Sequence, residues 1–206
     1  FPSVYELYEM DIESKEFKKL KFGEATQIAF NGNVTLIGRN IGDPAKWKRY
    51  RGGTAGHLWI DRNGNGVFKR FLQHINGNIA GTMLIGTNAY FVSDHEGIAN
   101  LYSSDLSGKR IQKLTEHKKY YVRNAHTDGK FIVYHAGGDL FRYDVNNNKS
   151  EIIEIDYRGG RKQLSRKFHN AINYLTDFSV SNDGSSMTIN SRGKSLSFGN
   201  WNGAVV

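Results

Sequence analysis

The sequence predicts an all-β protein that forms a sector of a β-propeller with four-stranded antiparallel blades. The first observation is a motif that occurs four times: a leucine, then an aromatic residue, then a short step to an aspartate. Its copies begin at Leu7, Leu58, Leu101 and Leu140. A spacing of about 40 residues is typical of propeller blades, in which each supersecondary unit stacks on the next. The second observation is the composition. The 206 residues include 23 glycines, 12 phenylalanines and 11 tyrosines but only two prolines, which suits short strands and tight turns.

Alternating apolar residues and turn signals place the strands in order. The turn signals are Asn-Gly or Asp-Gly pairs and similar polar triplets, and they supply the positive φ angles that tight hairpins need. Strands are predicted over residues 4–12, 17–22, 25–30, 34–37, 80–85, 89–92, 131–134 and 187–189. Only residues 165–174 have a helical pattern, and that stretch is short.

Stacking these strands predicts a single incomplete propeller domain over residues 1–206, with about four blade equivalents. The expected blades span residues 1–22 (partial), 25–72 (with an insertion from 40 to 56), 79–115, 121–156 and 174–206 (partial). Because the first and last blades lack strands, we expect the chain to be a segment of a longer protein. Alone, such a segment would leave strand edges and apolar faces uncovered.

The composition also limits the function. There are no cysteines, which excludes disulfides, thiol nucleophiles and cysteine-ligated metals. No apolar run approaches the length of a membrane span, and no secretory signal is visible. We therefore expect a cytoplasmic protein without a membrane partner.

The formal net charge is +8, with basic residues concentrated in residues 15–21, 46–51, 109–119 and 158–167. These clusters have two interpretations: a footprint for an anion or a nucleic acid, or a solvated surface. The basic residues at 161, 162, 166 and 167 have no aromatic residue between them, although nucleic-acid platforms combine the two types. The solvated surface is favoured, and no nucleic-acid partner is expected.

No metal or cofactor site is predicted. Residues 61–66 match the first half of a calcium loop, D-x-N-x-N-G, but the twelfth position, which needs a carboxylate, is Leu72. A hairpin turn is the favoured interpretation. The seven histidines show no metal-binding spacing; they are His57, His74, His95, His117, His126, His135 and His169.

No catalytic residue is predicted either. The chain has no G-x-S-x-G turn, and no spacing supports a nucleophile with a base. Asp94, His95 and Glu96 cluster at a strand end, where they could face a ligand or form a solvated loop. We therefore expect no peptidase activity from these 206 residues alone.

The least repetitive stretch is the loop from Pro44 to Gly56, which has two aromatics, four cations and three glycines. It could contact a peptide or an anion, plug the space between blades through Trp47 and Tyr50, or contact another subunit. The plug is favoured. If the loop faces a peptide, Arg49 and Arg51 are the candidate contacts, because guanidinium groups bind carboxylates with paired hydrogen bonds.

At this loop the sequence resembles the six-bladed propeller of the tricorn proteases, and the similarity continues in order along nearly the whole chain. The residues that carry it are Ile37-Gly38-Arg39-Asn40, Trp47-Lys48, Tyr50-Arg51-Gly52-Gly53-Thr54, Leu58-Trp59-Ile60, Tyr90-Phe91-Val92-Ser93-Asp94, Glu96-Gly97, residues 101–109, Tyr120-Tyr121-Val122-Arg123, Asp128-Gly129-Lys130, Lys167-Phe168, Asp177-Phe178-Ser179 and Ser191-Arg192-Gly193. The Tyr-Arg-Gly-Gly element is the most specific of them.

The resemblance implies a fold and a function. Tricorn-like proteins are large cytosolic serine peptidases that assemble as hexamers and cut oligopeptides. Their catalytic serine, histidine and glutamate would lie beyond Val206, and the paired arginine that holds the substrate carboxylate would lie before Phe1. The chain would then be a non-catalytic propeller segment that shapes a peptide channel. The alternatives are a stand-alone propeller that binds a ligand or a protein and has no peptidase activity, and a basic propeller that binds nucleic acid.

Overall fold

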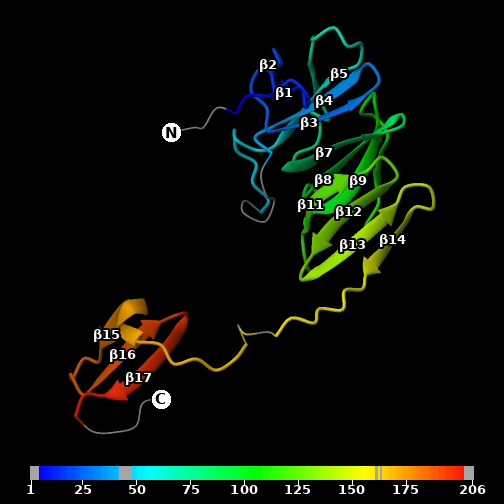
Figure 1. Ribbon diagram of the computed structural model, residues 1–206. Helices are drawn as coiled ribbons and strands as arrows, with labels where there is room; N and C mark the ends of the chain where they lie inside the picture. The colour runs from blue at the N-terminus through cyan, green and yellow to red at the C-terminus, as the bar shows by residue number, and fades with distance from the viewer. Residues whose placement is uncertain (1–4, 42–47, 161, 163, 202–206) are drawn as a thin grey trace. The chain divides into compact units, whose positions relative to one another are not determined.

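The computed structural model describes residues 5–41, 48–160, 162 and 164–201, and it divides into two compact units (Figure 1). One unit spans Phe1–Ile155 and the other Asp156–Val206. In the described residues, every element is a β-strand except one short 3₁₀ helix. The all-β prediction is therefore confirmed. No helix in these ranges has the length and apolar character that a membrane span requires.

The first sheet is a two-stranded hairpin of β1 (Tyr8–Met10) and β2 (Phe17–Lys19). Both strands are shorter than the predicted stretches 4–12 and 17–22, and all their residues are exposed. The turn between them is held locally, because the Asp11 carboxylate accepts the Ser14 backbone N–H at 2.7 Å. With only one partner strand each, the two strands pair over just three residues.

Three four-stranded antiparallel sheets follow, and in each the strand order is the chain order. The first contains β3 (Gln27–Asn31), β4 (Val34–Arg39), β5 (His57–Asp61) and β6 (Lys69–Phe71). The second contains β7 (Ile79–Ile85), β8 (Asn88–Ser93), β9 (Asn100–Asp105) and β10 (Ile111–Lys113). The third contains β11 (Val122–Thr127), β12 (Phe131–Ala136), β13 (Asp139–Asp144) and β14 (Lys149–Ile153). The repeated leucine–aromatic–aspartate motif is the third strand of each sheet, namely β5, β9 and β13.

The sheets pack face to face, as propeller blades do. One apolar cluster joins the first two sheets through buried side chains such as Leu36, Leu58 and Phe91. Phe91 stacks on Tyr102 with ring centroids 5.8 Å apart. A second cluster joins the β7–β10 sheet to the β11–β14 sheet, and Ile132 is fully buried there.

The first strands of the three sheets lie next to one another, because β3 contacts β7 and β7 contacts β11. This is the arrangement of inner strands around a propeller axis. The pairing register shifts in two of them, between Ala80 and Met83 in β7 and between Arg123 and His126 in β11. Such irregularities bend a strand and redirect its side chains.

The C-terminal unit is a three-stranded sheet of β15 (Leu175–Val180), β16 (Ser186–Ser191) and β17 (Lys194–Gly199). Among the residues that the structure describes, helical structure is confined to η1 (Ala171–Tyr174), the end of the predicted stretch 165–174. The assignment of residues 1–206 to a single incomplete propeller stays a prediction, because the two units are described separately.

Candidate functional site

The buried carboxylate of Asp94, just after β8, anchors the loop that contains the two predicted arginines. Its side chain has no exposed surface. Oδ2 accepts the Arg49 backbone N–H at 2.6 Å. Oδ1 accepts the Asn78 backbone N–H at 2.9 Å and Nη1 of Arg51 at 3.2 Å. These three hydrogen bonds, one of them from the charged Arg51 side chain, compensate the Asp94 carboxylate for its burial.

The other end of this loop is fixed by Asn78, which precedes β7. The Asn78 side-chain oxygen accepts the Gly56 backbone N–H at 2.7 Å. Gly56 lies so close to β7 that an added Cβ would be 2.0 Å from the carbonyl oxygen of Ile79. Within the loop, the Thr54 hydroxyl donates to the Tyr50 hydroxyl at 3.0 Å. Residues 49–56 are therefore held at both ends against the β7–β8 hairpin.

The two predicted contact residues, Arg49 and Arg51, have different surroundings in the structure. The Arg51 guanidinium pairs with Asp94 and also donates to the Asp94 carbonyl oxygen at 3.3 Å. Arg49 donates its backbone N–H to Asp94, whereas its side chain lines a cavity. Trp47, the other aromatic residue of the predicted plug, lies outside the described residues.

The cavity has a volume of about 740 Å³ and combines cations, aromatics and glycines. Its lining residues are Lys48, Arg49, Ile98, Lys119, Tyr120, Tyr121, Arg123, Gly137 and Gly138. None of these described lining residues is acidic, so the cavity favours an anion.

Aromatic rings hold two of the cations. The ammonium group of Lys48 lies 5.3 Å from the centroid of the Tyr121 ring, and that of Lys119 lies 5.2 Å from the Tyr120 ring. The Tyr121 hydroxyl donates to the carbonyl oxygen of Gly97 at 3.2 Å. Burial, together with the negative charge of Asp94, raises the pKa of Tyr121, so its hydroxyl stays protonated.

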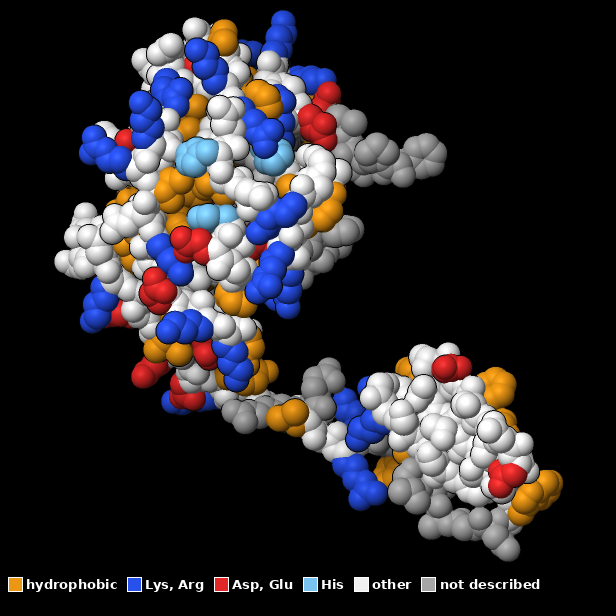
Figure 2. Space-filling view, turned by 180° about the vertical axis from the view of Figure 1, so that it is seen from behind, with side chains coloured by type: hydrophobic (Ala, Val, Ile, Leu, Met, Phe, Trp, Pro, Cys, Tyr) orange, Lys and Arg blue, Asp and Glu red, His pale blue; other side chains and the backbone are white. Residues whose placement is uncertain are grey.

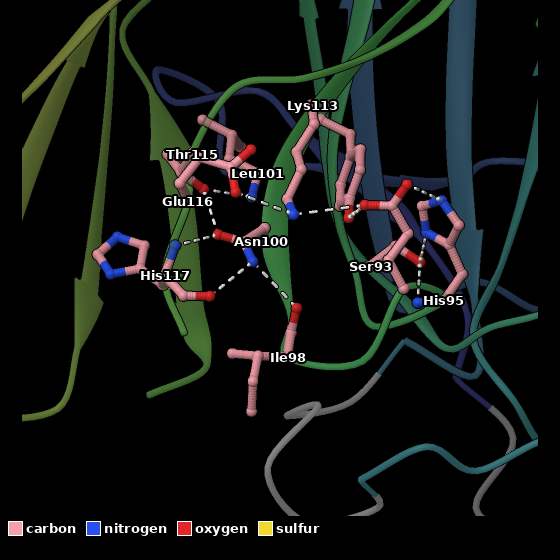
Figure 3. A network of polar contacts seen from close by, with 11 residues as sticks. Ser93, His95, Ile98, Asn100, Leu101, Lys113, Thr115, Glu116 and His117 are labelled. Atoms are coloured by element: carbon pink, nitrogen blue, oxygen red, sulfur yellow. Dashed lines mark hydrogen bonds and ion pairs between the residues drawn. The ribbon is translucent and has the colours of Figure 1, made fainter. Parts of the chain in front are cut away.

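A polar network around Asn100, at the start of β9, positions the segment that leads to Lys119 (Figure 3). The Asn100 amide nitrogen donates to the carbonyl oxygens of Ile98 and His117, both at 3.1 Å. Its oxygen accepts the Thr115 hydroxyl and the His117 backbone N–H, both at 2.8 Å. Asn100 is buried with all four hydrogen bonds made, so its role is to hold this segment in place.

Lys119, Tyr120 and Arg123 line the same cavity as Arg49, and the sequence did not predict this grouping. The sequence favours a solvated surface for the basic residues at 109–119, which include Lys119. The available signal was the aromatic pair Tyr120-Tyr121 directly after Lys119, because cations next to aromatics are typical of binding surfaces.

Asp94, His95 and Glu96 do not form one site. His95 Nδ1 lies 3.1 Å from the Ser93 hydroxyl, and His95 Nε2 lies 4.0 Å from Glu96 (Figure 3). The composition matches a serine–histidine–carboxylate group, but Ser93 has no exposed surface. A substrate carbonyl cannot reach a buried hydroxyl, and the contact joins residues only two positions apart, as in a local turn. Burial also lowers the pKa of His95.

The Asp61 carboxylate, at the end of β5, binds its own turn. It accepts backbone N–H groups from Asn63 at 2.9 Å, Gly64 at 3.0 Å and Gly66 at 2.6 Å. Burial alone would raise the pKa of Asp61, but these hydrogen bonds outweigh it and hold the pKa below its ordinary value.

We expect millimolar calcium to leave the melting temperature unchanged. The Asp61 oxygens already accept hydrogen bonds from the turn, and the position where a calcium loop has a second carboxylate is occupied by Leu72. Thermal melting with calcium and with a chelator measures this. A rise of several degrees that Asp61→Ala abolishes would contradict the expectation.

Basic side chains cover much of the face of the N-terminal unit seen in Figure 2, and acidic ones are fewer and scattered among them. This agrees with the formal net charge of +8.

The comparisons with known proteins agree with the fold. Residues 1–149 match the family model of the tricorn protease N-terminal beta propeller domain. A tricorn protease homolog of Saccharolobus solfataricus is 36% identical over 201 residues, which cover 98% of this chain and 18% of that protein. The tricorn protease of Thermoplasma acidophilum is 36% identical over 155 residues, which cover 75% of this chain and 14% of that protein. The chain thus spans 18% and 14% of the lengths of these two curated relatives.

A solved structure gives the same result. The crystal structure of the tricorn protease superposes with a TM-score of 0.75 at 31% identity, and the match covers all of this chain and 20% of that one. The propeller architecture, the family model over most of the chain and these relatives together place the chain in the tricorn protease family, in its N-terminal β-propeller domain.

Proposed function

We propose that this chain is a non-catalytic β-propeller segment of a tricorn-type serine peptidase and that it shapes the channel through which oligopeptides pass. The observation that carries the proposal is the match to the propeller domain of proteins named as proteases. Ser93, whose hydroxyl lies 3.1 Å from His95, is buried. The hydrolytic groups would therefore be supplied by another part of the protein.

The geometry supports a path for peptides near the axis. The inner strands β3, β7 and β11 lie next to one another, and the cationic cavity is lined partly by Arg123 of β11. Arg49 and Arg51 remain the proposed peptide contacts. Arg49 would contact the peptide directly, and Arg51 would act indirectly, because it pairs with Asp94, which holds the Arg49 backbone. By family membership, the complete protein would be a cytoplasmic homohexamer.

The sequence leaves two other functions open: a stand-alone binding propeller and a nucleic-acid-binding propeller. The curated relatives are much longer than this chain, which supports a segment of a larger enzyme over a stand-alone propeller. For nucleic acid, a platform of several exposed aromatics would be expected. Among the described lining residues of the cationic cavity, Tyr120 is exposed but Tyr121 is buried.

Photo-crosslinking tests the channel. The complete protein, blocked with a serine-peptidase inhibitor, is irradiated with an oligopeptide that carries a photoreactive phenylalanine, and the adducts are mapped by mass spectrometry. We expect adducts on β3, β7, β11 and residues 48–56, and fewer on the outer strands β6, β10 and β14. An excess of unlabelled peptide should remove them. Adducts confined to the outer strands, or absent from this chain while the uninhibited protein cuts the same peptide, would refute the proposal.

A further inference from the structure

We propose that the cavity lined by Arg49, Lys119 and Tyr120 binds a carboxylate group of an oligopeptide. Arg49 and Lys119 would be the charged contacts, and the ring of Tyr120 would form an apolar wall for the neighbouring side chain. This inference rests on the proposed function, because it names the chemical group that the propeller recognises in its peptides.

The first argument is charge. Lys48 and Arg49 enter the cavity from the loop before β5, and Lys119 enters from the segment before β11. Cations from two distant segments are thus brought together, and no acidic side chain stands among the described residues that line the cavity. Like charges at close range repel, so an anion between them is stabilised. The planar guanidinium of Arg49 matches a carboxylate, which accepts two parallel hydrogen bonds.

The second argument is size and the nature of the walls. A volume of about 740 Å³ is far larger than an isolated anion needs and is within the range of pockets that take small organic ligands. Tyr120 is half exposed, with 50% of its surface accessible, and Ile98 adds apolar surface. Gly137 makes room for the Tyr120 ring, since an added Cβ would lie 2.7 Å from it. The walls therefore suit a carboxylate attached to an apolar group better than an inorganic anion.

The third argument is pre-organisation. Asp94 binds the backbone of Arg49 and the side chain of Arg51, and the Arg49 side chain, which also hydrogen-bonds to the Tyr121 side chain, lines the cavity. On the opposite side, Asn100 holds the backbone of His117, two residues before Lys119. Both cation-bearing segments are thus fixed by buried polar groups. Groups held in place in this way lose less entropy when a ligand binds.

Binding to matched peptides tests the proposal. Three peptides labelled at the N-terminus share one apolar sequence. One ends in a free carboxylate, one ends in an amide, and one has an amide end and an internal glutamate. Their dissociation constants are measured by fluorescence anisotropy on the complete protein blocked with a serine-peptidase inhibitor. We expect at least one carboxylate peptide to bind more tightly than the neutral amide, and which one does so identifies the source of the carboxylate.

Variants locate the site. Arg49→Gln combined with Lys119→Gln should weaken binding of the carboxylate peptide about tenfold, because hydrogen bonds to two charged groups are lost. It should leave the neutral peptide unchanged. The matched control is Arg110→Gln with Lys118→Gln, which removes the same charge from residues outside the cavity lining. An equal loss in the control and the cavity variant would overturn the proposal, since it would show only long-range attraction.

The remaining outcomes separate this inference from the proposed function. Equal affinity for all three peptides, with crosslinks still on the inner strands, would refute the carboxylate site and leave the channel standing. Absence of both crosslinks and peptide binding would refute the channel and the site together. Inorganic phosphate is tested as a competitor. If it binds in the cavity while no peptide carboxylate does, the cavity holds an inorganic anion only and the proposal is wrong.

Discussion

Replacing Asp94 with alanine is expected to destabilise the N-terminal unit by about 3 kcal/mol, the lower end of the range for breaking a buried ion pair. The lower end applies because the Arg51 side chain is 32% exposed and can turn to water when its partner is removed. The backbone N–H groups of Arg49 and Asn78 have no such freedom and would lose their acceptor. The loop over residues 49–56 should then detach at its N-terminal end.

Amide hydrogen exchange in the complete protein measures this effect locally, which avoids assigning one unfolding free energy to a multidomain protein. The amides of Arg49 and Asn78 should exchange about 100-fold faster in Asp94→Ala. Asp94→Asn should be intermediate, because it keeps an acceptor oxygen but loses the charge. Glu154→Ala is the control, since Glu154 is exposed. Unchanged exchange in Asp94→Ala would show that the loop is held by something else.

The second large effect is expected from Gly56→Ala. The new methyl group would lie 2.0 Å from the carbonyl oxygen of Ile79, which is a backbone atom at the start of β7 and cannot rotate away. Ile79 is itself buried, so the loop or the strand has to shift. Overpacking of this kind costs about 3 kcal/mol, and the hydrogen bond from Gly56 to Asn78 would be lost with it.

Gly53→Ala is the matched control, because a Cβ at Gly53 meets no atom within 4 Å. Thermal melting and amide exchange of both variants, in the complete protein, compare the two positions. Gly56→Ala should melt earlier and exchange faster over residues 49–56, and Gly53→Ala should behave like the unmodified protein. If both variants melt alike, the close approach of Gly56 to β7 is not important for stability.

The fold class could be predicted because its signals are local. Alternating apolar residues define strands, and Asp-Gly and Asn-Gly pairs close the hairpins between them. The repeated motif coincides with the third strands β5, β9 and β13, which explains why the same residue types recur. The strands β1 and β2 are shorter than predicted. Periodicity indicates which residues can form a strand, but it does not indicate whether a neighbouring strand extends the pairing.

The candidate site was predicted only in part, and the physical reason is distance along the chain. The composition of the 44–56 loop was enough to single out Arg49 and Arg51. Their different roles depend on Asp94, which is 43 positions beyond Arg51 and reaches it only because the β7–β10 sheet packs on the β3–β6 sheet.

The sequence by itself determined that the chain is all-β, that its blades repeat and that it resembles the tricorn propeller, since these properties reside in periodicity and short motifs. Only the tertiary structure decided that Arg51 pairs with a buried carboxylate while Arg49 and Lys119 meet at one cavity. Contacts between residues far apart in sequence are set by how the blades stack, and stacking depends on the burial of both faces of each sheet, which local patterns do not encode.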